Sequence, residues 1–527
     1  MLRKLMLVVV LAGCARAAAP LGEPAPTATI MQEVPTAAAG SAISPEALRR
    51  DLFAFAADSM MGREAGSAGA IKGGQFIAGR LRAAGVEPAG DSGTYFQRVP
   101  LTRTAIGASS AIRITKDGQT QTIGIGAHGL VPLLSLGPGA PLPRLEASGD
   151  LVFAGYALSS DGRNDLANLD VGDKAVVYVH GAPASLDSAT RQSLSSGAAI
   201  GQRLGALISR GPAAVVMLTT GELADDFEAV AAQVTGAMRL GEPEAEQPRQ
   251  LPMVLIGVAA DRPELLPAGF PENDAPGALS GRLEAQVGVE QQPVESFNVL
   301  GVVRGSDPAL SNTFVAVGAH LDHIGIQPAV NGDSIANGAD DDGSGSMGVL
   351  HVAETWAKMP VKPKRSGLFV WHTGEEKGLF GSEWFTEHPT VPIDSVVAQL
   401  NADMIGRNAP DSLYIVGPQA APERQSQVVG AIVDSVNATL AQPFAFNREW
   451  DSPEHPERIY FRSDHYNYAE KGIPIVFFTT GLHDDYHKVS DEPDKIDYDK
   501  LARVTTLILR ATEAIANRPA RPVPSVP

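Results

Sequence analysis

The second half of the chain alternates short apolar runs with amphipathic stretches, and turns rich in Gly and Pro separate them. The apolar runs have the length of buried strands, whereas the amphipathic stretches repeat apolar residues at helical spacing. Strands are predicted at 313–318, 367–371, 396–400, 413–416 and 473–478. Helices are predicted at about 346–358, 382–386, 423–440 and 498–516. This alternation indicates an α/β fold with a mixed central sheet flanked by helices.

Two further helices are expected before residue 90. Ser44 followed by Pro45 is typical of a helix start, and this helix is expected to reach about residue 57. A second helix is expected over about 70–84, because Gly85 and Pro88 terminate it. Residues 44–126 are therefore assigned to the first part of the main domain, whose larger part is expected over 293–518.

Residues 127–292 show a different pattern of apolar runs and turns. Short β-like runs at 151–156, 174–179, 213–218 and 253–256 lie between turns, and one helix is expected at 201–210. The region contains only two histidines, far apart in sequence, and its acidic residues are scattered. We therefore expect a separate small α/β domain, inserted into the main one and without chemistry of its own.

The N-terminus has the pattern of an export signal. A basic stretch, Met1–Lys4, precedes apolar residues and then Leu11-Ala-Gly-Cys14. The expected organisation is a signal peptide at 1–14, a flexible linker at 15–43 and a tail at 519–527. The only cysteine is Cys14, so an intramolecular disulfide and a cysteine nucleophile are excluded.

Composition narrows the class of protein. The 527 residues are 44% hydrophobic and 19% charged, which is typical of a globular protein. A net charge of −18 disfavours nucleic acid as a partner, because a phosphate backbone requires a basic face. The chain has no apolar run of the length, about 18 residues, that spans a bilayer.

Acidic residues and histidines follow the predicted strands with regularity. They are His320 and Asp322, the run Asp340-Asp341-Asp342, Glu375 and Glu376, Asp403, and His487. The carboxyl ends of parallel strands share one edge of a sheet, so these groups are expected to meet there. A set of imidazoles and carboxylates without thiolate suits zinc, with cobalt or manganese as substitutes. Two ions are held if one carboxylate bridges them.

Glu375 and Glu376 are expected to have different roles, since the side chains of adjacent residues rarely point at the same ion. One can bind metal while the other accepts a proton from water. Competing chemistries lack their signatures: the sequence contains no His-Glu-x-x-His, no Gly-x-Ser-x-Gly and no phosphate-binding loop.

This constellation resembles the co-catalytic di-zinc exopeptidases, a family with secreted bacterial aminopeptidases and glutamate carboxypeptidases. The resemblance spans about 296–516 and includes Gly62-Arg63 and Gly85-Val-Glu-Pro88. The insertion resembles a protease-associated domain through 164–177 and 201–218. Leu11-Ala-Gly-Cys14 resembles the bacterial lipoprotein box, which implies a lipidated Cys14 and possible membrane anchoring.

The resemblance implies a role for each matched residue. His320 and Asp403 would bind one zinc ion, Glu376 and His487 the other, and Asp341 would bridge both. The peptide bond between Asp341 and Asp342 is expected to be cis, as it often is in the family. Asp322 would fix the His320 tautomer and Glu375 would be the general base. Asp491 and the segment Arg462-Ser-Asp-His465 would support the site, while His323 and His483 receive no metal role.

The implied function is an exported zinc-dependent aminopeptidase that releases N-terminal amino acids from peptide substrates by two-metal activation of water. A carboxypeptidase or aminoacyl-amide hydrolase on the same fold stays an alternative, and an inactive peptidase-like binding protein is a remote one. The protein would be periplasmic or anchored to the outer membrane as a lipoprotein, or else secreted after cleavage near Ala15-Arg-Ala17. Side-chain preference, native metal and oligomeric state are not readable from the sequence.

Overall fold

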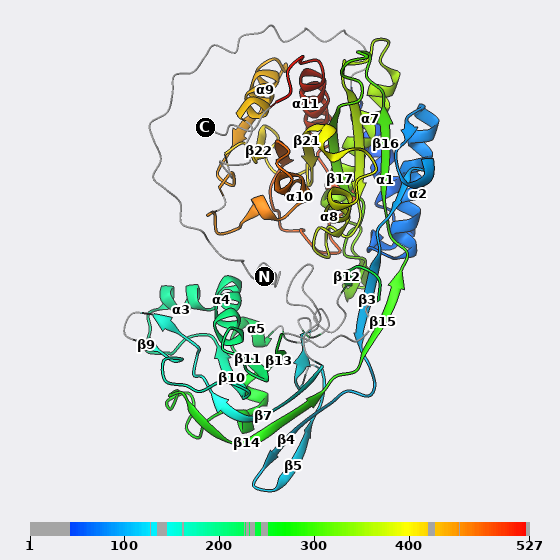
Figure 1. The fold of residues 1–527 in the computed structure, drawn as a ribbon. Helices are drawn as coiled ribbons and strands as arrows, with labels where there is room; N and C mark the ends of the chain where they lie inside the picture. Colours follow the sequence, from blue (N-terminus) through cyan, green and yellow to red (C-terminus); the bar gives the residue numbers. More distant parts are fainter. Residues whose placement is uncertain are drawn as a thin grey trace. The chain divides into compact units, whose positions relative to one another are not determined.

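The computed structural model describes residues 43–126, 128–133, 145–160, 163–225, 227, 231, 238–243, 251–419, 427–452 and 454–522. The predicted signal peptide and linker lie outside the described residues, apart from Ile43, and so does the tail beyond 522. The chain forms two compact units. The first unit comprises the described residues up to Leu101 and those from Val294 onward, and the second unit runs from Thr102 to Pro293 (Figure 1).

A nine-stranded sheet forms the centre of the first unit. Its order is β1 (Glu87–Pro88), β16 (Phe297–Val303), β20 (Ser366–His372), β17 (Phe314–His320), β21 (Val396–Ala402), β24 (Ile475–Thr479), β22 (Ser412–Val416) and β23 (Ala445–Asn447), with β2 (Phe96–Arg98) paired to β16. Strands β20, β17, β21 and β24 are parallel, whereas β16 and β22 run antiparallel to their inner neighbours. The predicted mixed α/β sheet is confirmed.

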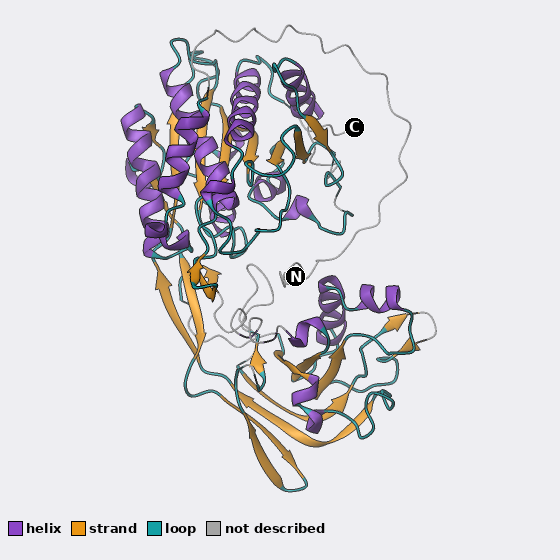
Figure 2. Cartoon of the chain, turned by 180° about the vertical axis from the view of Figure 1, so that it is seen from behind, coloured by secondary structure: helices purple, strands orange, loops and turns teal. Residues whose placement is uncertain are grey.

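Helices cover both faces of this sheet (Figure 2). One core contains residues of α1 (Pro45–Phe55), α2 (Ala68–Ala84), α7 (Gly345–Lys358), α9 (Gln427–Ala438) and α11 (Tyr498–Ala516). The other contains residues of α8 (Phe380–Glu387) and α10 (His465–Glu470). Because side chains alternate along a strand, Val315 and Val317 of β17 join the first core and Phe314 and Ala316 the second. The central strands are therefore mostly apolar and are buried on both faces.

The helix boundaries follow the capping residues. The Ser44 hydroxyl accepts a hydrogen bond from the Ala47 amide at 3.1 Å, and α1 begins directly after it. Helix α2 ends at Gly85, which adopts a left-handed conformation with φ of 75°. Both ends agree with the sequence prediction. No helix in the described ranges is long and apolar enough to cross a membrane.

The second unit contains its own eight-stranded sheet. The order is β5 (Gln119–Ile123), β4 (Ala111–Lys116), β14 (Gly277–Gln286), β7 (Glu146–Phe153), β10 (Ala175–His180), β11 (Ala214–Thr219), β13 (Met253–Val258) and β6 (Val131–Pro132). A three-stranded sheet joins β12 (Met238–Leu240), β3 (Leu101–Ile106) and β15 (Val289–Val294). Among its described residues lie the helices α3 (Ser188–Leu194), α4 (Gly197–Ile208) and α5 (Glu222–Asp225). The unit is thus a small α/β body, and its protease-associated character stays a prediction.

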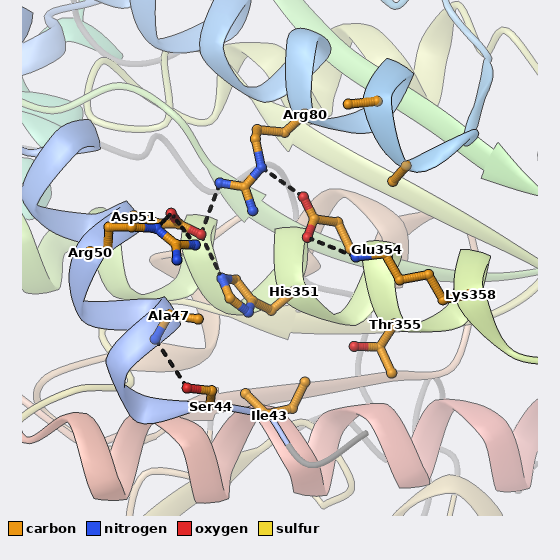
Figure 3. A pocket seen from close by; sticks show the side chains of 12 residues that line it. Ile43, Ser44, Ala47, Arg50, Asp51, Arg80, His351, Glu354, Thr355 and Lys358 are labelled. Atoms are coloured by element: carbon orange, nitrogen blue, oxygen red, sulfur yellow. Dashed lines mark hydrogen bonds and ion pairs between the residues drawn. The ribbon is translucent and has the colours of Figure 1, made fainter. Parts of the chain in front are cut away.

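A polar pocket of the first unit lies where α1, α2 and α7 meet (Figure 3). Buried Asp51 on α1 accepts contacts from His351 Nε2 at 2.9 Å and from Arg80 at 2.8 Å. Arg80 also reaches Glu354 at 2.8 Å. These pairs neutralise the charges inside the pocket and connect the three helices, which is a structural role.

Candidate active site

The polar residues singled out in the sequence lie at the carboxyl edge of the parallel strands. His320 is the last residue of β17, and Asp403 follows β21 directly. Glu375 and Glu376 come just after β20, and His487 lies in the loop after β24. Asp341 lies in the turn Ala339–Ser344, which leads into α7. Four parallel strands therefore deliver their polar loops to one edge, as expected for an open α/β sheet.

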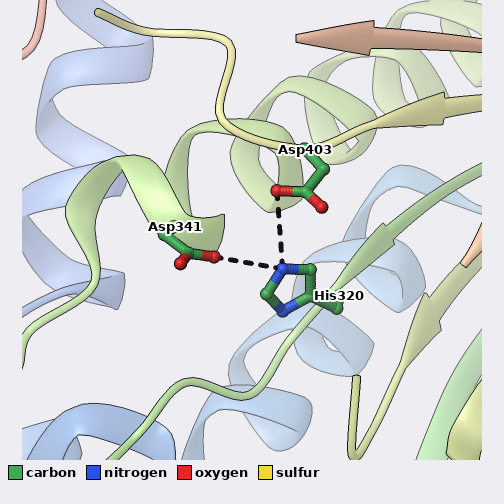
Figure 4. A group of neighbouring side chains, drawn as sticks. All are labelled: His320, Asp341 and Asp403. Carbon is green, nitrogen blue, oxygen red and sulfur yellow. Dashed lines mark ion pairs between the residues drawn. The ribbon is translucent and has the colours of Figure 1, made fainter. Parts of the chain in front are cut away.

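His320, Asp341 and Asp403 form one buried group (Figure 4). The His320 Nε2 atom lies 3.3 Å from Asp341 Oδ1 and 3.6 Å from Asp403 Oδ1. The other ring nitrogen, Nδ1, lies 3.0 Å from the main-chain carbonyl of Asp322. Since a carbonyl only accepts, Nδ1 carries a proton, and Nε2 faces the two carboxylates. The Asp322 backbone, not its carboxylate, therefore sets this tautomer.

Asp341, Glu376 and His487 form a second group. The His487 Nε2 atom lies 3.1 Å from Asp341 Oδ2 and 2.9 Å from Glu376 Oε2. Asp341 thus presents one oxygen to His320 and the other to His487. The structure brings all five expected ligand residues together, and Asp341 is the member common to both groups.

The structure also places His323 in this second group, although the sequence analysis gave it no role. Its Nδ1 atom lies 2.7 Å from Glu376 Oε1 and 3.8 Å from Asp341 Oδ2. His323 is fully buried. The signal was present in the sequence, because His323 ends the segment His320-Leu-Asp-His323, whose first residue had been placed at the site.

The chemistry of the two groups fits divalent metal ions. Within the described part of the chain, Nε2 of His320, Nε2 of His487 and Oδ2 of Asp341 are buried and have no hydrogen-bond partner. Buried polar atoms without partners are costly unless something satisfies them. The donors are imidazole nitrogens and carboxylate oxygens, which suit zinc. Orientation, burial and donor type therefore agree with a metal site.

The pKa values of His487 and His320 also show that the site favours positive charge. Burial alone would lower the pKa of His487, but the carboxylates of Glu376 and Asp341 outweigh it and raise the pKa to about 10. Burial likewise opposes the charge of His320, yet Glu375 and Asp403 hold its pKa well above the ordinary value. The carboxylates thus draw protons onto both imidazoles, and a bound cation would meet the same need.

Glu375 lies beside both groups and is 6% exposed. Its amide donates to Asp322 Oδ1 at 3.3 Å, which orients the turn after β20. Burial, together with the negative charges of Asp403, Glu376 and Asp464, raises the pKa of Glu375 well above its usual value. A raised pKa makes this carboxylate a better proton acceptor.

Asp340 and Asp342 shape the turn around Asp341. Asp340 accepts from the Gly406 amide at 2.7 Å, and its other oxygen lies 3.2 Å from His483 Nε2. Asp342 accepts from the amides of His320, at 3.1 Å, and Gly345, at 2.9 Å. The peptide bond between Asp341 and Asp342 is cis, which confirms the expectation.

Asp491 braces the turn from another loop. Its Oδ2 atom accepts from the amides of Asp340, at 3.0 Å, and Asp341, at 3.1 Å. The segment Arg462–His465 makes further contacts: Ser463 Oγ donates to Asp403 Oδ2 at 2.6 Å, and Arg462 donates to the Tyr486 hydroxyl at 3.2 Å. The Tyr486 ring stacks on His487 with a centroid separation of 3.8 Å. Neither Tyr486 nor His483 had been assigned a supporting contact from the sequence.

Arg63 connects the N-terminal segment to the loops of the site. It is completely buried and donates to the carbonyls of Leu321, at 3.0 Å, Asn337, at 2.7 Å, and Gly338, at 2.8 Å. These carbonyls flank the His320–His323 loop and the Asp340–Asp342 turn. The Gly62-Arg63 motif therefore positions two of the loops that carry the polar groups.

Comparison with known proteins points to one family. Residues 298–512 match peptidase family M28. The chain is 30% identical over 213 residues to a probable leucine aminopeptidase 1 of Trichophyton verrucosum, a match that covers 38% of this chain and 54% of that protein. It is 28% identical over 200 residues to leupeptin-inactivating enzyme 1 of Streptomyces exfoliatus, covering 38% and 39% of the two chains. The chain therefore spans about half, or less, of these two relatives.

Solved structures share the fold. An aminopeptidase from Aneurinibacillus sp. strain AM-1 superposes with a TM-score of 0.56 at 18% identity, covering 92% of this chain and 96% of that one. A zinc aminopeptidase from Bacillus subtilis gives 0.50 at 17% identity, covering 94% and 98%.

The family match extends from β16 into α11 and so includes every residue of the two groups. The architecture and the clustered polar residues agree with it independently. Residues 298–512, which contain both groups, are therefore similar to peptidase family M28.

Proposed function

We propose that this protein is a two-metal aminopeptidase. The observation that carries the proposal is the arrangement of Asp341, whose two oxygens face His320 at 3.3 Å and His487 at 3.1 Å. One carboxylate shared by two ligand groups is the arrangement that holds a pair of ions. Relatives named leucine aminopeptidases support the reaction and suggest an apolar first residue in the substrate.

In this proposal the two groups divide the ligands. His320, Asp341 and Asp403 would hold one zinc ion, and Asp341, Glu376 and His487 the other, with cobalt or manganese as substitutes. Zinc bound there would supply positive charge that polarises a carbonyl and lowers the pKa of water. Asp342, Asp340 and Asp491 keep the Asp341 carboxylate in place through their amide contacts.

Glu375 would carry the proton transfer. Its buried carboxylate accepts a proton from the water that attacks the scissile carbonyl and then donates it to the leaving amine. The same negatively charged edge would attract the free α-ammonium of a peptide, since the buried carboxylates of Asp403 and Glu375 lie there.

A specific observation keeps a carboxypeptidase as a second candidate. The Arg462 side chain is 26% exposed, and the charge of Glu375 contributes to its raised pKa, so the two groups are near one another. A guanidinium in this position could bind the terminal carboxylate of a peptide. An aminopeptidase needs a free amine on its substrate, whereas a carboxypeptidase needs a free terminal carboxylate, so the required free end distinguishes the two activities.

We further propose export, with lipidation at Cys14. The support is the basic stretch at Met1–Lys4 and the Leu11-Ala-Gly-Cys14 box. The protein would then act outside the cytoplasm, in the periplasm or at the outer membrane.

A panel of peptides with free or blocked ends tests the reaction. Leucyl peptides with a free amine should be hydrolysed from the N-terminus. N-acetylation should lower kcat/KM by at least about 100-fold, because an ion pair of about 3 kcal/mol is lost. A chelator should abolish the activity and zinc should restore it. Release of C-terminal residues from N-acetylated peptides would support the carboxypeptidase instead, and a chain without bound zinc or activity would support a binding protein.

Replacement of the proposed base separates chemistry from metal binding. Glu375→Gln should lower kcat by roughly a thousandfold, the scale of general-base catalysis, and leave the zinc content at the wild-type level. Steady-state kinetics and elemental analysis measure the two effects. The matched control is Glu87→Gln at a side chain that is 52% exposed, which should change neither. A near wild-type rate for Glu375→Gln would show that another group is the base.

The acidic run permits an internal comparison. Asp341→Asn should lower zinc affinity by more than about 100-fold, whereas Asp340→Asn should lower it by about 10-fold, the range of groups that act through a ligand. Asp340→Asn should instead lower the free energy of unfolding, because the amide has one oxygen, whereas the carboxylate accepts from Gly406 with one oxygen and pairs with His483 through the other. Zinc titration and urea unfolding give both quantities. Equal losses of affinity at the two positions would mean that the wrong aspartate was chosen.

The export proposal has its own test. In a bacterial host, the wild-type chain should partition into the detergent phase of a membrane extract, and Cys14→Ser should move it to the aqueous phase. Mass spectrometry of the mature N-terminus should find acylated Cys14. Identical partitioning of the two chains would exclude the lipid anchor.

A further inference from the structure

His323 is the one histidine at the site whose role the proposed ligand set leaves unexplained. We infer that His323 is a positioning residue, which holds Glu376 through an Nδ1–H hydrogen bond and thereby fixes the ligand group of Asp341, Glu376 and His487. The inference rests on the proposed two-metal function, and it assigns His323 a supporting contact to Glu376 outside the proposed ligand set.

The two oxygens of Glu376 have different partners. Oε1 lies 2.7 Å from His323 Nδ1 in a hydrogen bond, and Oε2 lies 2.9 Å from His487 Nε2. Asp341 Oδ2 is 3.1 Å from His487 Nε2 but 3.8 Å from His323 Nδ1. Asp341 and Glu376 therefore converge on His487, while His323 approaches Glu376 from the side of its other oxygen.

The tautomer follows from this contact. The Glu376 carboxylate can only accept when ionised, so Nδ1 of His323 carries the proton. The second nitrogen, Nε2, points away from Nδ1 across the ring and has no hydrogen-bond partner within the described ranges. Because Nδ1 faces Glu376 and Asp341, Nε2 of the same ring faces away from them.

The His323 ring is held where it is. The His323 amide donates to the Arg63 carbonyl at 3.2 Å. Gly338 lies directly against the ring, since a Cβ atom added there would be 2.5 Å from His323 Cγ. The ring also meets His487 edge to face, with centroids 5.8 Å apart at 69°. These contacts hold the His323 ring beside Glu376.

Positioning matters here because Glu376 lies among other carboxylates. Without an N–H donor at Oε1, the buried carboxylate would lose one partner and gain freedom to rotate away from His487. Groups that orient a ligand in this way typically contribute about 10–100-fold in metal affinity. His323 should therefore affect one of the two ions far more than the other.

Three substitutions separate positioning from ligation. His323→Asn places an amide N–H near the position of Nδ1 and can still donate to Glu376. His323→Gln places its amide near the position of Nε2, and His323→Ala removes both nitrogens. Calorimetric zinc titration of the metal-stripped full chain should give wild-type affinities within about threefold for His323→Asn. For His323→Gln and His323→Ala, the affinity of one ion should fall about 10–100-fold, with the other unchanged.

His351→Asn is the matched control. His351 is another buried histidine bound to a carboxylate, Asp51, at 2.9 Å, but it lies at the pocket of α1, α2 and α7. Its substitution should lower the free energy of unfolding in urea and leave both zinc affinities unchanged. This separates a general loss of packing from a loss at the site.

The remaining outcomes decide the inference. If His323→Asn loses one ion as completely as His323→Ala while both chains unfold like the control, His323 is a ligand and the inference is overturned. It is also overturned if His323→Ala binds both ions with wild-type affinity. If the wild-type chain binds no zinc, the proposed function fails and the inference with it, so the wild-type titration distinguishes the two failures.

Discussion

Buried negative charge at one edge of the sheet is the constraint on which the rest of the first unit depends. Asp322, Asp340, Asp341 and Asp342 are all at most 3% exposed. Buried carboxylates are unfavourable unless hydrogen bonds and cations compensate them. The structure supplies amide donors from several loops, whereas the fully buried Arg63 donates to main-chain carbonyls. The charge that is still uncompensated explains why the site is suited to cations.

Compensation by amides also organises the loops. Asp342 accepts from the end of β17 and from the start of α7, and Asp491 accepts from the turn that contains Asp341. Each carboxylate that does not belong to the two ligand groups therefore ties neighbouring segments together. The acidic run thus has two functions: Asp341 faces the histidines, and its neighbours fix the backbone that presents it.

The sequence was sufficient for the sheet and for the polar residues that meet at its edge, because both follow from local pattern. Apolar runs identify buried strands, and the residues that follow parallel strands are expected at one edge of the sheet. His320, Asp403 and His487 were predicted to lie together for this reason. The contacts of His323 and of Arg63 were not predictable in this way. They depend on how loops far apart in sequence pack, such as Gly338 against the His323 ring. Similarly, the sequence suggested the Asp322 carboxylate as the partner of His320, but a main-chain carbonyl makes that contact.

The point of insertion explains how the chain carries a second unit without disturbing this site. Strand β2 precedes the second unit and β16 follows it, and they pair antiparallel with Arg98 opposite Phe297. The chain therefore leaves and re-enters the first unit on adjacent strands, so closing the intervening loop costs little even when it is long. Both ligand groups come from residues after β16, whereas Arg63 lies before β2. Arg63 nevertheless donates to main-chain carbonyls more than two hundred residues later, at Leu321 and Asn337.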